Sequence, residues 1–584
     1  MNDFVTWDIE TKGLGGELVI GGIYTGSSYY EFKDWNTLFF MFKSGVIPAK
    51  SNLFAHNAGK YDNRYVMEQA KKHGFEISSI QYIQNGVVFT LKLGKKRWYF
   101  RDSYHLMPES LKSLCESFEI EHSKKEFDIK KWMTEGYKIT DELKTYLYYD
   151  CVSLYELIDK FSELMNNDVK QTIASTAFNK LLQTEYKNIK LKKLLANFMK
   201  KEHERDIRFA YKGGRVEVFT RHGENLYKYD VNSLYPHVMK KYDYPFAKYH
   251  VVSNSKYAEK YIARGELGVY YCGIECPYMK YPYMKYPYLG KKYNNKLIFP
   301  VGEWVDWLTS FEIIEARKRG YKIDISHGYT FERKGHVFEN YVNEYYKIKQ
   351  SSTGAKKKVA KLILNSAYGK FGQKRVMRQL VTEDELIKKD IPITEVQQVT
   401  NDLYQYERES YANRQINPVI AVFVTAYARH ELYLGMENII EKGGNIYYVD
   451  TDCIVSDKQL DEEMIDSDEL GLWDCEDENI IEGVFISPKL YSIRNKNDVL
   501  IKAKGIDSEM QKELSFRKMK SLLHNEDEIP FQKNRVAGFM EHFKRLATDK
   551  NNYISNITSK RSISGKYDKR VLRDDRINTE PIKL

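Results

Sequence analysis

Two aspartates interrupt an apolar stretch near residue 450 and constrain the fold more than any other feature of the chain. Asp450 and Asp452 are separated by one residue, and apolar residues run up to them and resume after them. This pattern predicts a β-hairpin with two acids at its tip. Like charges this close repel, and burying them is costly unless a cation lies between them. Because Mg²⁺ prefers carboxylate oxygens, a metal site is one interpretation. Taken alone, the run Asp450-Thr451-Asp452 is more typical of a polar hairpin turn.

The length and composition bound the class of protein. At 584 residues the chain is too long for one domain, and three or more are expected. A hydrophobic content of 42% is ample for packed cores. No run of about 18 apolar residues is present, and the N-terminus lacks the pattern of a secretion signal, so we expect neither a membrane span nor secretion. Six scattered cysteines predict a reducing compartment without a disulfide framework, and we interpret Cys272 and Cys276 as strand residues.

The basic residues are clustered. The net charge is +10, from 91 basic and 81 acidic residues, with basic clusters at residues 356–361 and 560–570. Aromatic residues make up 14% of the chain. Cations that hold phosphates and rings that stack on bases together suit a nucleic-acid groove. A solvated, lysine-rich surface is the plain alternative.

Periodicity predicts two large α/β regions. The first spans residues 1–165, with strands at 4–10, 18–24 and 87–93 and helices at 63–73 and 141–164. Residues 170–209 are predicted to be helical and connecting. The second region spans 210–505, with a strand at 226–230, one long basic helix at 338–368 and a helix at 416–442. A proline repeat at 277–288 predicts an exposed, extended insertion, and the basic stretch after 510 a small separate lobe.

A second group of acids lies in the first region. Asp8 and Glu10 share one face of a strand because side chains alternate with period two. Tyr146 and Asp150 share one face of a helix. With Asp62, the four carboxylates suffice to hold two metal ions about 3.5–4 Å apart, and Tyr146 is placed to orient an attacking water.

These motifs resemble the proofreading 3′–5′ exonuclease domain of DNA polymerases, which has a ribonuclease-H-like fold. The motifs Asp-x-Glu, Asn-x2–3-Phe/Tyr-Asp and Tyr-x3-Asp are matched by Asp8, Glu10, Asn57, Tyr61, Asp62, Tyr146 and Asp150. The resemblance implies that the four acids bind metal and that Asn57 and Tyr61 hold the single-stranded 3′ end. It also implies a strand contact at Ser110-Leu111 and a phosphate contact at Lys124 or Lys125.

A third group of polar residues follows a strand and a helix of the second region. Asp230 ends an apolar strand, and the tight turn over residues 233–236 offers N–H groups and a hydroxyl suited to a triphosphate. Lys361, Asn365 and Tyr368 fall at i, i+4 and i+7, so they share a helix face. A cation, an amide and a ring on one face suit phosphate, minor-groove and base contacts. A solvated face is the alternative for Lys361.

With Asp450 and Asp452, these segments resemble the three motifs of family B DNA polymerases, Asp-x2-Ser-Leu-Tyr-Pro, Lys-x3-Asn-Ser-x-Tyr-Gly and Tyr-x-Asp-Thr-Asp-Ser. Cys453 departs from the third motif, where the family has serine. Residues 211–214 resemble a Tyr-x-Gly-Gly linker motif, and 489–491 a Lys-x-Tyr motif that holds the primer terminus. The resemblance assigns nucleotide binding to Val231, Ser233, Leu234, Tyr235, Lys349, Lys361, Asn365 and Tyr368. It assigns DNA contacts to Tyr211, Gly213, Gly214, Tyr448, Lys489 and Tyr491.

The long segments between the motifs resemble the protein-primed branch of this family, the phi-29 type of phages and linear plasmids. The expected fold is multidomain α/β and α+β, with a ribonuclease-H-like exonuclease domain followed by a right-hand polymerase with two insertions. The expected domains are the exonuclease at 1–170, a linker and first part of the palm at 171–249, a first insertion at 250–335, the fingers at 336–372, a second insertion at 373–412, the rest of the palm at 413–510 and the thumb at 511–584.

The resemblance implies template-directed addition of dNTPs with two Mg²⁺ ions per active site, for which Mn²⁺ can substitute. Asp230, Asp452 and the Val231 carbonyl would hold the polymerase ions, with Asp450 tuning the site from its edge. Tyr235 would exclude a ribose 2′-hydroxyl. The insertions would encircle DNA and give processivity and strand displacement. The expected partners are template and primer DNA, dNTPs, a terminal protein primer and a single-stranded DNA-binding protein. The protein would act as a monomer in the host cytoplasm, without a membrane.

Three alternatives remain at this point. One is a family B polymerase of a mobile element that uses a DNA or RNA primer. Another is a nuclease whose polymerase half only holds DNA, which the presence of Asp230 and Asp452 disfavours. The third is a non-catalytic nucleic-acid-binding replication factor, which would leave the placed acids without a purpose. Tyr235 disfavours an RNA polymerase.

Overall fold

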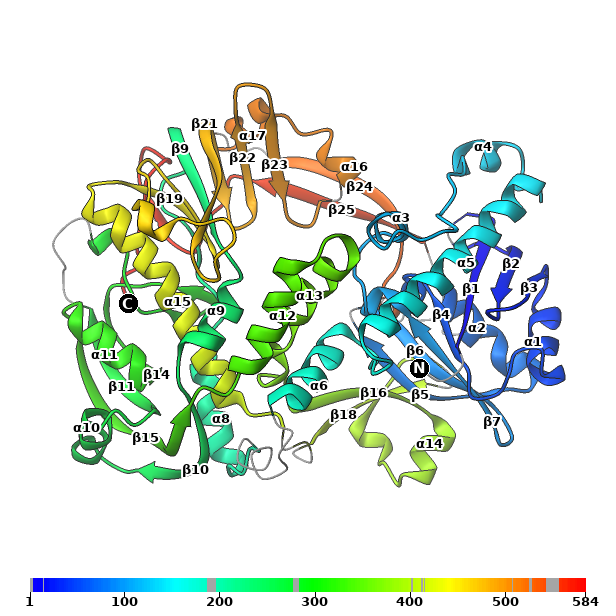
Figure 1. Cartoon of the computed structure of the whole chain (residues 1–584), viewed down its shortest axis with the longest axis horizontal. Helices are drawn as coiled ribbons and strands as arrows, with labels where there is room; N and C mark the ends of the chain where they lie inside the picture. Colours follow the sequence, from blue (N-terminus) through cyan, green and yellow to red (C-terminus); the bar gives the residue numbers. More distant parts are fainter. Residues whose placement is uncertain are drawn as a thin grey trace.

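The computed structural model describes residues 4–13, 15–83, 85–185, 196–276, 283–400, 403–410, 413, 415–506, 508–524, 528–541 and 556–584. An N-terminal α/β unit lies on one side of the molecule and a larger unit on the other (Figure 1). Helices α12 (Glu339–Ser351) and α13 (Gly354–Ser366) stand between the two units. Among the residues described, no helix has both the length and the apolar composition to cross a membrane.

The N-terminal unit is built on a mixed sheet. In sheet order its strands are β5 (Glu76–Ile83), β6 (Gly86–Leu93), β7 (Lys96–Asp102), β4 (Asn52–Ala55), β1 (Phe4–Thr11), β2 (Leu18–Tyr24) and β3 (Tyr29–Phe32). Val5, Trp7 and Ile9 pack with residues of α1 (Trp35–Ser44) and α2 (Asp62–Ala70) on one face. The alternate residues of β1 therefore point to the other face, where α5 (Asp141–Leu164) packs. The predicted strands and helices of this unit are confirmed.

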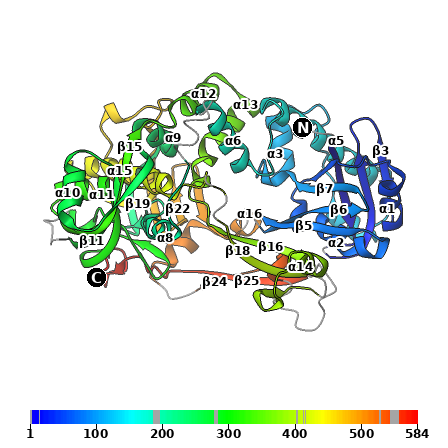
Figure 2. The same cartoon turned by 90° about the horizontal axis from the view of Figure 1, so that it is seen from below.

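The region expected to be the second insertion (residues 373–412) joins this sheet. It contains β16 (Val376–Thr382), α14 (Glu383–Lys388), β17 (Val396–Gln398) and β18 (Leu403–Glu409). Strand β16 pairs antiparallel with β5, with Gln379 opposite Gln81 and Leu380 opposite Ile80. The result is one sheet of ten strands that spans two parts of the chain, and Figure 2 shows β16 and β18 running toward β5.

The larger unit is built on a seven-stranded sheet. In sheet order its strands are β23 (Val499–Ala503), β22 (Leu490–Arg494), β21 (Trp473–Ser487), β9 (His222–Val231), β20 (Cys453–Ser456), β19 (Ile446–Asp450) and β8 (Val216–Val218). Helix α15 (Pro418–Glu441) is buried along most of its length and contacts β19 and β20. The predicted hairpin, the strand before Asp230 and the helix at 416–442 are confirmed.

The region expected to be the first insertion contains an antiparallel sheet. Its strands, in order, are β10 (Tyr244–Val252), β15 (Lys322–Gly335), β11 (Gly268–Cys276) and β14 (Gly302–Thr309), accompanied by α10 (Ser255–Ala263) and α11 (Ser310–Lys318). Cys272 and Cys276 lie buried in β11, which confirms them as strand residues.

The single long helix predicted at residues 338–368 is wrong. The segment forms two helices, α12 and α13, that pack against each other. The break falls in Ser-Ser-Thr-Gly (residues 351–354), where Ser352 and Thr353 are extended and Gly354 has φ 52°. Serine and threonine compete with the helix for backbone hydrogen bonds, and glycine tolerates a positive φ, so this run ends one helix and starts another.

The prediction of an exposed insertion is wrong for the second half of the proline repeat. Residues 277–282 lie outside the described residues, but Tyr286 and Tyr288 are 1% and 6% exposed. The Tyr286 hydroxyl accepts the Ile446 N–H at 3.1 Å, and the Tyr433 hydroxyl donates to the Tyr286 carbonyl at 2.9 Å. Tyrosine buries a large apolar ring if its hydroxyl finds a partner. The second half of the repeat therefore packs beneath the β19 hairpin.

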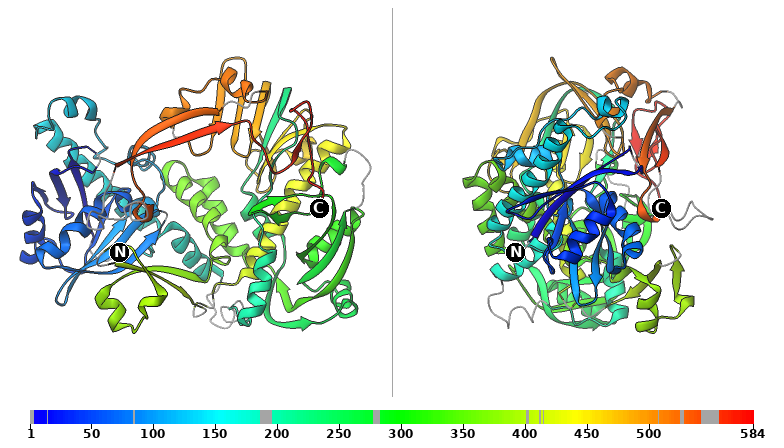
Figure 3. Two further views of the ribbon diagram at one scale, coloured as in Figure 1. Left: turned by 180° about the vertical axis from the view of Figure 1, so that it is seen from behind. Right: turned by 90° about the vertical axis from the view of Figure 1, so that its right-hand side faces the viewer.

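The prediction that the C-terminal stretch forms a small separate lobe is wrong. Strands β24 (Glu528–Val536) and β25 (Asn556–Ser564) form a hairpin that reaches across to the N-terminal unit (Figure 3). Just after β24, Phe539 is fully buried in the N-terminal core, and the Arg64 guanidinium donates to the Ala537 carbonyl at 2.6 Å. Residues 565–584 return to the larger unit, where Thr579 bonds to Val218 and Phe219.

One residue of the predicted basic surface is instead part of the core. Arg570 is 2% exposed and lies 3.2 Å from Glu217, which also pairs with Arg215 at 2.7 Å. Two buried arginines flank one buried carboxylate beneath the hairpin, so opposite charges are paired there. Arg570 therefore belongs to neither a nucleic-acid groove nor a solvated surface.

Candidate active sites

The hairpin acids meet Asp230 at one end of the seven-stranded sheet. Asp450 is the last residue of β19, and Thr451 has φ 64°, which turns the chain tightly into β20. Asp230 lies opposite Cys453 in the β9–β20 pair, and the Val231 N–H donates to the Asp452 carbonyl at 2.8 Å. The structure thus brings Asp230 and Asp452 together from segments more than 200 residues apart.

These carboxylates are electrostatically unfavourable on their own. Burial, followed by the charge of Asp452, raises the pKa of Asp230 to about 7. Burial also raises the pKa of Asp452. Groups that resist ionisation in this way are stabilised by a bound cation.

Asp450 differs from Asp452 in having its own cation. The Lys489 ammonium lies 3.0 Å from the Asp450 carboxylate, and the Tyr448 hydroxyl donates to the same carboxylate at 3.0 Å. The backbone N–H of Lys489 donates to the Tyr448 hydroxyl in turn, at 3.0 Å. Tyr491 packs in the core cluster that contains Tyr448. The residues assigned to the primer terminus therefore form one network with the edge of the acidic site.

The departure from the family pattern at Cys453 is structurally mild. Its side chain is buried with Tyr448 and Tyr491 in the core cluster beneath the hairpin. Burial raises the pKa of the thiol, so it stays protonated. The buried thiol therefore adds no charge beside the neighbouring acids.

A basic patch adjoins the acids on the side of α12 and α13. The Lys349 ammonium donates to the Ser233 hydroxyl at 3.1 Å. Burial, followed by the charges of Lys361 and Lys357, lowers the pKa of Lys349. Lys361 in turn opposes the rise in the pKa of Asp230, which places its charge nearby. In the part of the chain that is described, no carboxylate lies within ion-pair distance of Lys349 or Lys361, so these charges are available to a polyanion.

Two tyrosine rings close this patch. Tyr235 in α9 (Leu234–Lys241) and Tyr368 are stacked, with ring centroids 4.4 Å apart. Lys361 and Asn365 lie within α13, and Tyr368 follows it directly in a short 3-10 turn. The side chain of Leu234 is buried in the core, which leaves its backbone to face a ligand.

The linker motif lies against the hairpin turn. The Thr451 N–H donates to the Arg215 carbonyl at 2.7 Å, next to Gly214. A Cβ atom on Gly214 would come within 2.8 Å of the Thr451 side chain, which explains the need for glycine there. A Cβ on Gly213 would meet nothing within 4 Å, and Tyr211 packs against Gly372.

The second acidic site lies in the N-terminal unit, between β1, α2 and α5. Burial and then Asp150 raise the pKa of Asp8 to about 7, and burial and then Asp8 raise that of Glu10 to about 8. Asp62, the first residue of α2, has a pKa raised well above its ordinary value by burial and then by Asp8. The predicted four carboxylates are therefore assembled in one place.

The structure distinguishes the two candidate lysines. The Lys124 ammonium lies 2.7 Å from an Asp150 carboxylate oxygen and 5.0 Å from the Tyr146 ring centroid. Lys125 instead points to the ring of Tyr149, 4.7 Å away. Lys124 is thus the lysine that belongs to the acidic site.

The residues assigned to the single strand flank this site. Asn57 has φ 62° and precedes the turn that leads to Tyr61, whose hydroxyl donates to the Gly13 carbonyl at 3.1 Å. Ser110 caps α3 (Leu111–Ser117) by accepting the Ser113 N–H at 3.2 Å, and Leu111 is buried in the core. Their contacts with DNA stay predictions.

Both acidic sites offer the kind of oxygen ligand that divalent cations prefer. In the N-terminal site, Asp150 Oδ1 is buried without a hydrogen-bond partner, which leaves a carboxylate oxygen to coordinate an ion. In the other site, Asp230 and Asp452 repel each other at the end of a sheet. Carboxylate oxygens are the ligands preferred by Mg²⁺ and Mn²⁺.

Sequence reasoning missed two residues near these sites. Glu476 pairs with Lys228 and contributes to the raised pKa of Asp230. Arg64 is 1% exposed and lines a cavity of about 830 Å³ together with Asn57 and Tyr61 on one side and Lys533 and Arg535 of the β24–β25 hairpin on the other. Neither residue belongs to a short motif, because both act through contacts with distant segments.

Comparison with known proteins agrees with this geometry. The family model described as DNA polymerase type B, organellar and viral, matches residues 43–135 and 130–441. The chain is 28% identical to a probable DNA polymerase of Podospora anserina, over 82% of this chain and 45% of that protein. It is 26% identical to the DNA-directed DNA polymerase of Enterobacteria phage PRD1, over 83% and 81% of the two chains. The chain spans about half the length of the fungal relatives.

A solved structure has the same fold. The Phi29 DNA polymerase complexed with primer-template DNA and incoming nucleotides superimposes with a TM-score of 0.74 at 19% identity, over 96% of this chain and 100% of that one. The expected fold, an exonuclease-like unit followed by a polymerase-like unit, is thereby confirmed. Because the family model matches more than half of the chain, the chain belongs to the type B DNA polymerases of the organellar and viral group.

Proposed function

We propose that the protein is a replicative DNA-directed DNA polymerase with a separate 3′–5′ exonuclease site. The observation that carries this proposal is the pairing of Asp230 and Asp452 beside Lys349 and Lys361. Acids that need cations and lysines that need anions lie side by side, as a metal-bound triphosphate requires. The second set of acids, in the N-terminal unit, provides a distinct hydrolytic site.

In the polymerase site, Asp230 and Asp452 would hold divalent ions with the Val231 carbonyl. Mg²⁺, or Mn²⁺ in its place, would lower the pKa of the primer 3′-hydroxyl and stabilise the leaving pyrophosphate. Lys349 and Lys361 offset the charge of the triphosphate, with the Ser233 hydroxyl held by Lys349. Tyr235, stacked on Tyr368, forms the floor on which the sugar rests.

In the exonuclease site, Asp8, Glu10, Asp62 and Asp150 would hold the ions. Lys124 offsets negative charge next to Asp150 and is placed to contact the scissile phosphate. The Tyr146 hydroxyl lies on the same helix face as Asp150 and orients the attacking water. Asn57 and Tyr61 hold the single-stranded end.

Two variants test whether extension and degradation take place at separate sites. Asp452→Ala should lower primer extension by about 10²–10³-fold or more and leave 3′–5′ degradation of single-stranded DNA within about twofold. Asp8→Ala should do the reverse. Extension and degradation are measured on the same labelled primer with Mg²⁺. Loss of both activities in either variant would contradict two separate sites.

We further propose that synthesis starts on a terminal protein. The hydroxyl of a serine, threonine or tyrosine of that protein would take the place of the 3′-hydroxyl beside Asp230 and Asp452. The family match and the similarity to phage polymerases support this mode. Incubation with labelled dATP, Mg²⁺ and a candidate terminal protein should yield protein that carries the label covalently. Normal extension of a DNA primer without that product would favour a nucleic-acid primer instead.

The remaining assignments follow from this function. Template and primer DNA and dNTPs are the proposed substrates, with a single-stranded DNA-binding protein as a partner and a monomer as the working form. The proposed palm lies over the seven-stranded sheet, the fingers over α12 and α13, and the thumb over the β24–β25 hairpin. Location in a host cytoplasm stays a prediction.

A further inference from the structure

The segment that carries Lys124 has no regular structure of its own. Residues 118–128 join α3 to α4 (Ile129–Thr134), and residues 121–128 form neither a helix nor a strand. Because no backbone ladder fixes the place of Lys124, the contacts of side chains with neighbouring elements must do so. Residues 118–125 are called the lysine segment below.

Helix α5 holds the start of the lysine segment. The Lys160 ammonium, near the end of α5, donates to the carbonyl of Phe118 at 3.1 Å and to that of Glu119 at 2.8 Å. Ile120 follows and is 4% exposed in the core. The Ser123 hydroxyl donates to the Ile120 carbonyl at 3.0 Å. The first residues of the segment are therefore fixed against α5 and the core.

One carboxylate on α5 holds the middle of the segment at two points. Glu156 Oε2 accepts the backbone N–H of His122 at 3.2 Å, and Glu156 Oε1 is hydrogen-bonded to Nδ1 of the same histidine. The His122 ring also lies beside the Tyr149 ring, with centroids 6.1 Å apart. Tyr149 and Glu156 are seven residues apart on α5, so both contacts come from one face of the helix. The two contacts between His122 and Glu156 are called the clamp below.

Two residues beyond the clamp, Lys124 enters the N-terminal acidic site. Its Nζ atom donates to Asp150 Oδ2 at 2.7 Å, whereas Asp150 Oδ1 has no hydrogen-bond partner among the residues described. Burial raises the pKa of Asp8 and Glu10, and the charge of Lys124 opposes that rise. The position of the ammonium therefore decides which Asp150 oxygen is left for an ion, and how far the charge of the acids is offset.

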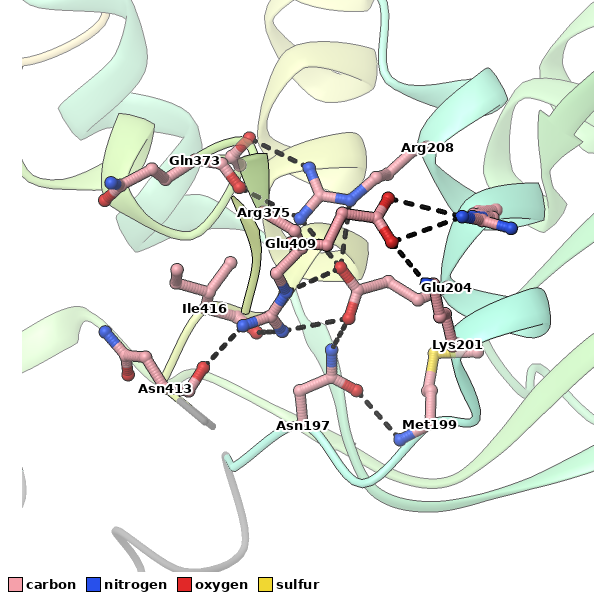
Figure 4. Close-up of polar contacts among 12 residues, drawn as sticks. Asn197, Met199, Lys201, Glu204, Arg208, Gln373, Arg375, Glu409, Asn413 and Ile416 are labelled. Carbon is pink, nitrogen blue, oxygen red and sulfur yellow. Dashed lines mark hydrogen bonds and ion pairs between the residues drawn. The ribbon is translucent and has the colours of Figure 1, made fainter. Parts of the chain in front are cut away.

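The clamp is too exposed to be a main source of stability. The side chains of His122 and Glu156 are 37% and 24% exposed, and pairs in contact with water contribute little. A carboxylate that holds the fold together looks different. Glu204 on α8 (Lys201–Ala210) is 1% exposed and accepts hydrogen bonds from Arg375 at 2.8 and 2.9 Å (Figure 4). Loss of the clamp should therefore shift the lysine segment without unfolding the unit.

We propose that His122 and Glu156 are positioning residues of the exonuclease site, which hold the lysine segment on α5 so that Lys124 meets the scissile phosphate. Neither residue belongs to the motifs found in the sequence. Helix α5 carries both Asp150 and Glu156, so one rigid element sets the acid and the cation relative to each other. Misplacement of a group that acts in the transition state is costly in rate. The inference rests on the proposed function, because it concerns hydrolysis at the 3′ end.

The test measures kcat and KM for 3′–5′ degradation of labelled single-stranded DNA with Mg²⁺. His122→Ala removes the ring contact and should lower kcat by about 10-fold, and Glu156→Ala removes both contacts and should lower it by at least as much. KM should stay within about twofold, because other residues hold the strand. His122→Asn places an amide N–H where Nδ1 lies and should retain kcat within about threefold. Primer extension by all three variants should stay within about twofold of the wild type.

A matched control lies in the same connection between α3 and α4. Glu126 pairs with Lys112 of α3, and their side chains are 84% and 57% exposed. Glu126→Ala removes a paired carboxylate as Glu156→Ala does, but from a pair that does not hold the lysine segment on α5. It should degrade single-stranded DNA within about twofold of the wild type. A loss as large as that in Glu156→Ala would mean that any change in this connection has the effect, and would overturn the inference.

A double-mutant cycle shows whether the clamp acts through Lys124. If it does, Glu156→Ala should cost no more than about twofold in a Lys124→Met background, where the cation is already absent. A separate route would instead multiply the losses of the two single variants. Multiplied losses would therefore contradict a positioning role for the clamp.

The outcomes separate the inference from the proposed function. A wild type that does not degrade single-stranded DNA would overturn the proposed exonuclease. A wild type that does, together with unchanged kcat in His122→Ala and Glu156→Ala or an equal loss of primer extension, would overturn the inference alone. Should Glu156→Ala fail to fold, His122→Ala and its comparison with His122→Asn still decide, because the His122 side chain is partly exposed.

Discussion

The Lys489 ammonium lies 3.0 Å from both carboxylate oxygens of Asp450. Asp452, two residues away, has a raised pKa caused first by burial and only partly opposed by Lys489. The two acids of the hairpin are therefore not equivalent. Asp450 is neutralised within the protein, whereas Asp452 with Asp230 needs an external cation.

This inequivalence predicts different costs for the two acids. Asp450→Asn should lower kcat/KM for dNTP addition by about 10-fold, because a compensated edge charge is lost, and Asp452→Asn by about 10²–10³-fold or more. Lys489→Met should raise the KM for primer-template more than it lowers kcat. Steady-state extension with Mg²⁺ titration distinguishes these effects. Equal losses in the two aspartate variants would show that the acids act as a symmetric pair.

Tyr235 should control the choice of sugar. Its ring is fixed against Tyr368, so it cannot easily move away from a ribose 2′-hydroxyl. Tyr235→Ala should reduce the ratio of kcat/KM for dNTPs over NTPs by about 100-fold. Tyr235→Phe keeps the ring and should retain the ratio within about threefold. Discrimination that is unchanged in Tyr235→Ala would exclude this role.

Lys124 and Lys125 offer a matched pair in the exonuclease site. Lys124→Met removes the cation next to Asp150 and should lower 3′–5′ degradation by about 10²-fold. Lys125→Met removes only a contact with the Tyr149 ring and should stay within about threefold. Degradation of labelled single-stranded DNA is the measurement, with primer extension expected to be unaffected. The reverse order would mean that the assignment of the two lysines is wrong.

The raised pKa values of the exonuclease acids predict how stability depends on pH. The pKa of Asp8 is about 7 and that of Glu10 about 8, both above the unfolded values near 4. Between pH 4 and 8 the folded protein therefore binds more protons, and without metal its free energy of unfolding falls as pH rises. Asp8→Asn should raise stability in EDTA at pH 8 by on the order of 2 kcal/mol, because a buried charge is removed.

Thermal unfolding with EDTA or Mg²⁺ at pH 5 and pH 8 measures this effect. Mg²⁺ should stabilise the wild type more at pH 8 than at pH 5, because the carboxylates are charged at pH 8. At either pH, Mg²⁺ should stabilise Asp8→Asn less than the wild type. A midpoint in EDTA that rises between pH 5 and pH 8 would contradict the pKa shifts.

The docking of the proposed thumb on the N-terminal unit should depend on Phe539. Phe539 is fully buried in the core of that unit, and the buried Arg64 donates to the Ala537 carbonyl. Phe539→Ala should weaken the contact by about 3–5 kcal/mol and accelerate hydrogen exchange in α2 and in β24. Phe209→Ala, at a residue that is 62% exposed, is the control and should leave exchange unchanged. Unchanged exchange in Phe539→Ala would mean that the contact contributes little.

Local sequence patterns predicted the helices and strands whose structure depends mainly on residues close in sequence. The hairpin at Asp450, strand β1 and helix α5 were expected nearly at their observed bounds, because period-two or period-3.6 burial is written into consecutive residues. The break between α12 and α13 was missed, since the apolar spacing continues through the helix-breaking Ser-Ser-Thr-Gly run.

Where long-range contacts decide, the sequence was insufficient. Tyr286 looked exposed because proline recurs beside it, but its hydroxyl meets the Ile446 N–H, and so the ring can be buried. Arg570 looked like a surface cation, but it is neutralised by Glu217 more than 350 residues away. A polar group can be buried only when a partner satisfies it, and a distant partner leaves no local pattern.

The sequence by itself determined the chemistry: the acids at Asp8, Glu10, Asp62, Asp150, Asp230 and Asp452, in strands and helices of the expected kind. The tertiary structure decided which groups complete them. Lys124 rather than Lys125 reaches Asp150, and Lys489 neutralises Asp450. Residue type and spacing fix what a side chain can do, whereas the partner it meets depends on contacts between segments that only folding brings together.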